Sequence, residues 1–205
     1  WEVLVGVKAA CDKAGVAVVT GDTKVVERGK GDKVFINTTG IGEMHPKANI
    51  NVENIKPGDK IIVSGLVATH GMAIMALRHN ISFDDPIKSD TCNLNHTVKA
   101  LLDRFGNDIH LFRDPTRGGV SATLNEISRD TKLGLEIKQA DIPVDTRVDN
   151  VCEMLGLDPL YVANEGIFIA FVDESIANDL LEELKSLPFG ENAAIIGEVV
   201  EEHPG

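Results

Sequence analysis

The sequence predicts an α/β protein of the α+β type, in which sheets are backed by helices. Short β-branched segments alternate along the chain with segments whose apolar residues recur at helical spacing. This alternation does not follow the strict strand–helix–strand rhythm of a parallel sheet. The 205 residues are 43% hydrophobic but only 4% aromatic, so we expect an aliphatic core. A chain of this length can bury a substantial core in one domain plus part of another.

The first part of the chain predicts one helix and two extended segments. Apolar positions at helical spacing, followed by Gly15 as a C-cap, predict a helix over residues 2–14. Residues 16–29 mix β-branched runs around a Gly-Asp pair and predict an extended segment broken by a turn or bulge. Residues 33–42 predict a second strand that ends in a glycine-rich loop. Residues 43–59, which hold two prolines and several asparagines, are the best candidate for a linker.

The remainder predicts a series of strands and helices around the same kind of core. Buried-type apolar runs predict strands at residues 60–65, 110–113, 133–138, 161–172 (with a turn at 164–166) and 193–200. Helical spacing predicts helices at residues 70–79, 93–105, 146–155 and 173–186, and a further helix directly after Gly118 and Gly119.

Charge and cysteine content exclude several classes of function. The net charge of −12 argues against general affinity for nucleic acid or anionic membranes, both of which reward basic surfaces. No run of about 18 apolar residues and no charged-then-apolar leader is present, so we expect no membrane insertion. The three cysteines are widely spaced, which suits reduced thiols. Together these features predict a soluble, cytoplasmic protein.

The stretch "TGDTKVV", residues 20–26, is the first candidate site. Gly and Asp are disfavoured inside a strand, so Gly21-Asp22 indicates a bulge or a ligand contact. Asp22 could coordinate a magnesium ion bound to phosphates. Lys24 could contact a phosphate, or act as a base if burial lowers its pKa. The alternative is an ordinary hairpin with a solvated lysine.

The stretch "RDPTRGG", residues 113–119, is the second candidate. A helix N-terminus with nearby arginines is a natural phosphate seat, and the glycines permit close approach of the backbone. It is not a Walker loop, because the Gly-Lys-Ser/Thr ending is missing. The alternative is a helix that Asp114 or Thr116 caps, with arginines at its rim.

The turn "ANEG", residues 163–166, is the third candidate. Glu165 lies between two strand-like runs and could be a carboxylate that acts as a general base in a cleft. The alternative is an ordinary surface glutamate. The histidines show no HxxxH or Cys/His spacing that would predict a zinc site. His70, before Gly71 at a helix start, could touch a ligand, but a capping or packing role is favoured.

The chain resembles the HypE family of hydrogenase maturation factors in the stretches "GDTKVVERG", "INTTGIG", "IKPGDKIIVSG", "HGMAIM", "RDPTRGGVSATLNEIS" and "GLDPLYVANEG". That family belongs to a superfamily with aminoimidazole ribonucleotide synthetase, selenophosphate synthetase and thiamine-phosphate kinase. The resemblance implies the two-domain fold of aminoimidazole ribonucleotide synthetase and a carbamoyl dehydratase activity. In that reaction ATP activates an S-carboxamide on the C-terminal cysteine, and loss of a proton and phosphate leaves a thiocyanate. The thiocyanate supplies the cyanide of nickel–iron hydrogenase.

The resemblance also implies roles for individual residues. Lys24 and Glu165 are expected to be catalytic, with Glu165 the better base. Asp22 is expected to hold magnesium. The residues expected to line the ATP cleft are Asp22, Thr23, Arg113, Asp114, Thr116, Arg117, Gly118 and Gly119. The implied cofactors are ATP and Mg²⁺, and the implied partners are a second copy in a homodimer, a carbamoyltransferase and an iron-carrier complex.

Set against the family, the chain is expected to be a fragment. Residues 1–48 correspond to the back part of the ATP-binding N-terminal domain, which is incomplete, and residues 49–205 to most of the C-terminal domain. The terminal cysteine tail is absent, so we expect the fragment itself to be inactive. The alternatives are a selenophosphate or purine synthetase relative and, from another class, a non-catalytic dimerisation or docking module.

Overall fold

The computed structural model describes residues 1–31, 33–81 and 85–202. The chain forms two compact units, Trp1–Pro46 and Lys47–Gly205, and each is described by itself. Because these units are groupings of contacts, the assignment of residues 1–48 and 49–205 to the two domains of the family stays a prediction.

The first unit contains the helix α1, Glu2–Ala14, as predicted. Gly15 ends it in the left-handed conformation with φ 68°. The strands predicted at 16–29 and 33–42 are wrong: no strand is assigned to the described residues of these segments. Their β-branched and aromatic side chains are exposed, with Val19 at 89% and Phe35 at 78%. A strand exists only where a neighbour accepts its ladder of hydrogen bonds, and no described residue here supplies that ladder.

The second unit is built on a five-stranded sheet. Its strands are β1 (Lys60–Val63), β2 (Ile109–Arg113), β3 (Gly134–Ile137), β4 (Ile169–Val172) and β5 (Ala194–Val200), in the order β2-β4-β1-β5-β3. All four pairings are antiparallel, which confirms the α+β class. The strand predicted over 161–172 is wrong in its first half, since only β4 is assigned as a strand. The preceding residues form a short 3₁₀ helix, η4 (Pro159–Tyr161), and a turn.

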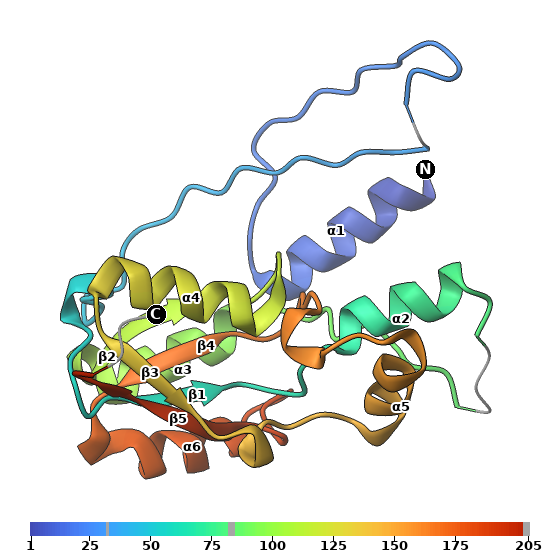
Figure 1. Cartoon of the computed structure of the whole chain (residues 1–205). Coiled ribbons are helices and arrows are strands. Elements are labelled where there is room, and N and C mark those ends of the chain that lie inside the picture. Colours follow the sequence, from blue (N-terminus) through green and yellow to red (C-terminus); the bar gives the residue numbers. More distant parts are fainter. Residues whose placement is uncertain (32, 82–84, 203–205) are drawn as a thin grey trace. The chain divides into compact units, whose positions relative to one another are not determined.

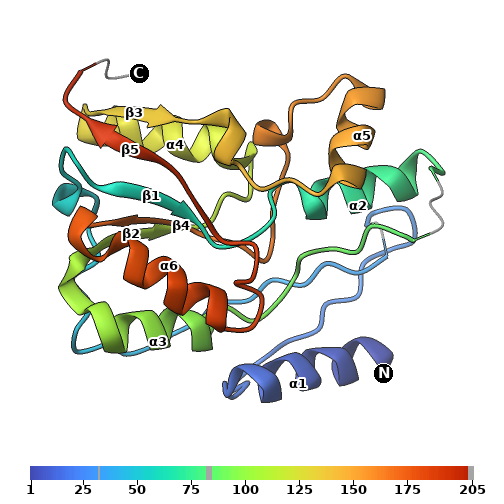
Figure 2. The same ribbon diagram turned by 90° about the horizontal axis from the view of Figure 1, so that it is seen from below.

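Helices cover both faces of this sheet (Figures 1 and 2). On one face lie α3 (Asn95–Phe105) and α6 (Ala177–Ser186), and on the other α2 (Thr69–Arg78), α4 (Gly119–Thr131) and α5 (Thr146–Leu155). The remaining 3₁₀ helices are η1 (Val52–Asn54), η2 (Gly106–Asp108), η3 (Gln139–Asp141) and η5 (Glu174–Ile176). No helix in the described part of the chain is long and apolar enough to span a bilayer.

The period-two pattern of strand β4 divides the core into two clusters. Ile169 and Phe171 of β4 pack with α2, α4 and α5, whereas Ala170 and Val172 pack with α3 and α6. All four residues are fully buried. Successive side chains of a strand point to opposite faces, so the unbroken apolar run of β4 is buried on both sides.

Strand register brings three loops to one end of the sheet. Val63, the last residue of β1, and Arg113, the last of β2, both pair with Ile169, the first residue of β4. The loops at 64–68 and 114–118 therefore start where the loop at 162–168 ends. These loops hold two of the candidate sequences, and the sheet places them side by side.

Candidate functional site

The three loops are joined by one buried side chain, Asn164, which is 1% exposed. Its Oδ1 accepts a hydrogen bond from the backbone N–H of Ala68 at 2.7 Å. Its Nδ2 donates to the carbonyl oxygens of Pro115 and Val162, each at 3.0 Å. Every polar atom of the amide thus has a backbone partner, and the partners lie in all three loops.

Glu165 follows directly and is exposed. Its backbone N–H donates to the carboxylate of Asp90 at 3.2 and 3.3 Å, while its own carboxylate has no hydrogen bond or ion pair with any described residue. Gly166 lets the two segments touch, because a Cβ there would lie 1.8 Å from the Asp90 carbonyl oxygen. The turn therefore fixes the backbone of Glu165 and leaves its carboxylate unpaired among the described residues.

The loop from Arg113 to Gly119 is held by local polar contacts. Arg113 forms an ion pair with Glu126 at 2.8 Å, and the Thr116 hydroxyl donates to Asp114 at 2.7 Å. The predicted capping of the next helix by Asp114 or Thr116 is wrong, because Gly118 is the N-cap of α4 and no side chain caps it. Thr116 is occupied by its contact with Asp114 instead. The N–H groups of the first turn of α4 therefore have no side-chain cap.

The two glycines have a geometric reason within the described structure. Gly118 and Gly119 both have positive φ, 72° and 65°. A Cβ on Gly119 would lie 2.4 Å from the carbonyl oxygen of Leu160 and 2.7 Å from that of Val162. These distances are too short for real contacts, so only glycine allows α4 to begin against the 160–162 backbone. The glycines thus place the start of α4 beside the Asn164 turn.

The "TGDTKVV" stretch lies in the other compact unit. Asp22, Thr23 and Lys24 are exposed, and Asp22 Oδ1 accepts a hydrogen bond from the Thr23 N–H at 2.8 Å. Within that unit Lys24 has no ion pair among the described residues. The convergence of Lys24 with Glu165 on one cleft stays a prediction, as does a nucleotide role for the 113–119 loop.

Sequence reasoning missed the polar contacts that join His70 to Ser89 and Thr91, next to the partner of Glu165. His70 Nδ1 lies 2.9 Å from the Ser89 hydroxyl, which lies 2.6 Å from the Thr91 hydroxyl. His70 is not the cap of α2, since Ala68 occupies that position. Asp90, the partner of the Glu165 N–H, belongs to the same short segment. No local signal marks these residues, because the segments that meet are 19 and 75 residues apart.

A second polar cluster lies at the opposite end of the same strands. Buried His110 pairs with buried Asp59 at 2.6 Å, and ligand atoms of these two and Asp173 lie within 4.8 Å of one another. Burial raises the pKa of the Asp59 carboxyl. Lys56 already forms an ion pair with Asp173 at 2.7 Å, which supplies a positive charge to this cluster. We interpret the cluster as a set of polar contacts that links the ends of β1, β2 and β4.

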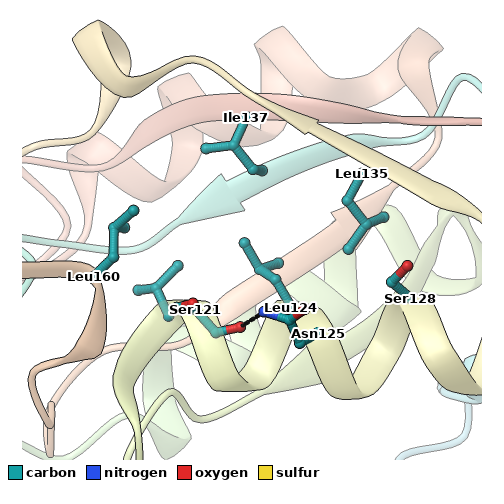
Figure 3. Close-up of a pocket in the computed structure, with 8 residues that line it drawn as sticks. Ser121, Leu124, Asn125, Ser128, Leu135, Ile137 and Leu160 are labelled. Carbon is teal, nitrogen blue, oxygen red and sulfur yellow. Dashed lines mark hydrogen bonds between the residues drawn. The ribbon is translucent and has the colours of Figure 1, made fainter. Parts of the chain in front are cut away.

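An apolar groove of about 220 Å³ runs between α4 and the edge strand β3. Figure 3 shows Leu135 and Ile137 of β3 facing Leu124 on α4, with Leu160 at one end. Asn125 turns back to donate to the Ser121 carbonyl at 2.8 Å. Among the described residues, those that line the groove are apolar or neutral polar.

The fold and the loop sequences define a class of protein. A family model described as "AIR synthase related protein, C-terminal domain" matches residues 56–205, and its N-terminal counterpart matches residues 1–44. The chain belongs to the AIR synthase related family. A solved structure, that of thiamine monophosphate kinase from Aquifex aeolicus, shares this fold at 16% identity and a TM-score of 0.53.

Within that family the chain is similar to proteins named carbamoyl dehydratase HypE. It is 48% identical over 196 residues to that of Azotobacter vinelandii, covering 95% of the chain and 57% of the relative. To the Escherichia coli protein it is 43% identical over 188 residues, covering 92% of the chain and 55% of the relative. The chain thus spans little more than half the length of these curated relatives.

Solved structures give the same result. A HypE–HypF complex superposes with a TM-score of 0.94 at 43% identity, covering 98% of this chain and 66% of that one. HypE in complex with ATP superposes with a TM-score of 0.92 at 44% identity, covering 97% of this chain and 59% of that one. These relatives confirm the predicted resemblance.

Proposed function

We propose that this chain forms part of a carbamoyl dehydratase, which converts an S-carboxamide on a C-terminal cysteine into a thiocyanate at the expense of ATP. The supporting observation is the Asn164–Gly166 turn, which presents an unpaired carboxylate from a fixed backbone. It does so in a chain with 48% identity to a protein named for this activity.

The chemistry requires an activated oxygen and a base. The amide oxygen is a poor leaving group, so ATP first transfers its γ-phosphoryl group to that oxygen. The base then takes a proton from nitrogen, the carbon–oxygen bond breaks, and the second nitrogen proton is lost as the carbon–nitrogen triple bond forms. The products are thiocyanate, ADP and phosphate. Glu165 is the proposed base, and Lys24 stabilises the charge that develops on the departing phosphate.

The remaining site residues have roles in binding the nucleotide. Asp22 is an exposed carboxylate, and a single carboxylate together with phosphate oxygens and water is a common environment for Mg²⁺. Thr23 and the loop containing Asp114, Thr116 and Arg117 would contact the phosphates of ATP. Exposed Arg117 has no ion pair with a described residue, so its guanidinium is available to an anion.

The proposal extends to partners and location. A carbamoyltransferase must supply the carbamoyl group, and a solved relative is named as a complex of HypE with HypF. An acceptor of cyanide, proposed to be an iron-carrier complex, must remove the product. We further propose that the protein works as a homodimer and that it lies in the cytoplasm. The free thiols Cys11, Cys92 and Cys152 suit such a reducing compartment.

The test is mass spectrometry of the terminal cysteine in a full-length protein that contains this chain. With ATP, magnesium and a carbamoyl donor system, we expect the carbamoylated peptide to lose the mass of one water. Glu165→Gln should retain the carbamoyl adduct without that loss. Glu191→Gln is the matched control, because Glu191 is an exposed glutamate in another turn. Normal thiocyanate formation by Glu165→Gln would refute the proposed role of this residue.

A further inference from the structure

The hydrogen bonds of Asn164 join the three loops of the candidate site. We propose that Asn164 is the positioning residue of the site, which holds the Glu165 backbone and the 114–118 loop in one fixed arrangement. This inference rests on the proposed role of Glu165 in dehydration. Asn164 does not touch the substrate on this view, and it acts through the loops to which it is bonded.

The bonding pattern explains why the residue is an asparagine. The site requires one acceptor, facing the Ala68 N–H, and two donors, facing the Pro115 and Val162 carbonyls. Only an amide supplies both from one planar group, whereas aspartate has no donor when ionised. Asn164 is 1% exposed, so water cannot replace a lost partner without a rearrangement.

The backbone groups of Ala163, Asn164 and Glu165 form hydrogen bonds to three different segments of the chain. The Ala163 carbonyl accepts from the Gly71 N–H at 3.0 Å, and the Asn164 N–H donates to the Pro115 carbonyl at 3.3 Å. The Glu165 N–H donates to Asp90. The backbone on both sides of Glu165 is therefore fixed, and the freedom of this residue is confined to its own side chain.

The sheet does not depend on this arrangement. Ser64 and Phe168 form their own pair, in which the Ser64 N–H donates to the Phe168 carbonyl at 3.0 Å and the Phe168 N–H donates to the Ser64 hydroxyl at 2.9 Å. Loss of the Asn164 amide should thus release the turn while β1 and β4 stay paired. That separation makes the inference testable by kinetics.

The decisive variant is Asn164→Asp in a full-length protein that contains this chain. Its carboxylate would face two carbonyl oxygens, so the turn must shift. We expect kcat for thiocyanate formation to fall about 100-fold, because a misplacement of about 1 Å costs that much. KM for ATP should rise as well, since the 114–118 loop is proposed to contact the phosphates and is bonded to Asn164. Asn178→Asp is the control, since Asn178 is exposed on α6. Hydrogen exchange should show protection retained at β4.

A second variant keeps the test decisive if Asn164→Asp fails to fold. Asp90→Ala removes the acceptor of the Glu165 N–H from a half-buried position, so it should fold and lower kcat in the same direction by a smaller factor. A folded Asn164→Asp with normal kcat, or a normal Asp90→Ala where Asn164→Asp does not fold, would overturn the inference. If Glu165→Gln is also fully active, the proposed role of Glu165 as the base fails as well, whereas the proposed function itself fails only if the unaltered protein forms no thiocyanate. If Glu165→Gln is inactive, the inference alone fails.

Discussion

Replacement of Gly119 by alanine tests whether the close approach of α4 to the 160–162 backbone is required by the fold. Gly119 has φ 65°, so any L side chain there is strained. The added Cβ would also lie 2.4 Å from the Leu160 carbonyl oxygen. A carbonyl oxygen belongs to the backbone and cannot rotate away as a side chain can. Either α4 or the 160–162 turn must therefore move.

The expected cost has two parts. The left-handed conformation costs an alanine about 1–2 kcal/mol relative to glycine. Forcing an extra carbon into packed backbone costs about 1–3 kcal/mol more. We therefore expect Gly119→Ala to lower the free energy of unfolding by about 2–5 kcal/mol. The displaced turn would carry Asn164 with it, since Val162 and Asn164 are hydrogen-bonded.

The assay is urea denaturation of the chain, and Gly156→Ala is the matched control. Gly156 has φ 67° at the end of α5 but nothing within 4 Å of its Cβ position. It should lose only the conformational part, about 1–2 kcal/mol. If the two variants lose equal stability, the close approach at Gly119 does not matter and our explanation of the glycine pair is wrong.

Three further results follow from the described contacts. Leu180→Ala should lower the free energy of unfolding in urea by about 2–5 kcal/mol, because Leu180 is fully buried. Its control, Leu77→Ala, lies at a 76% exposed position and should change that free energy by less than about 0.5 kcal/mol. Equal costs would contradict the described core. Asp145 caps α5, and its hydrogen bond to Arg147 lowers the pKa of the carboxyl. Asp145→Ala should therefore cost about 1 kcal/mol near neutral pH, and the difference from wild type should close as pH falls below about 4 through that lowered pKa; a difference that persists in acid would contradict this. Burial raises the pKa of the Cys152 thiol to about 11, so its alkylation should be far slower in the folded chain than in urea.

The helices were predictable because their signal is local. The helix predicted over 2–14 matches α1, and the predictions over 93–105 and 146–155 match α3 and α5. Helical hydrogen bonds join residues four apart, so spacing within one segment is enough to predict them. Short buried strands such as β1 were also recognised, since a short continuous apolar run marks them.

The extended segments at 16–29 and 33–42 show where this reasoning fails. A β-branched run is compatible with a strand, but pairing depends on a second segment that local sequence does not specify. Their exposed side chains, such as Val25 at 89% and Ile41 at 99%, lack within the described structure the neighbours that a strand requires.

The candidate site was predictable only in part. The turn around Glu165 and the glycines of the 113–119 loop can be recognised from local sequence. The role of Asn164 cannot, because its partners Pro115 and Ala68 are 49 and 96 residues away. Asp90 was missed for the same reason, since it meets Glu165 across 75 residues.

A double-mutant cycle tests most directly whether Lys24 and Glu165 serve one catalytic step. It compares thiocyanate formation by Lys24→Ala, Glu165→Gln and the double variant in a full-length protein that contains this chain. Residues that act on one step give strongly non-additive losses, so the double variant should be hardly slower than the worse single variant. Losses that multiply would show that the two residues act independently and would contradict a shared site.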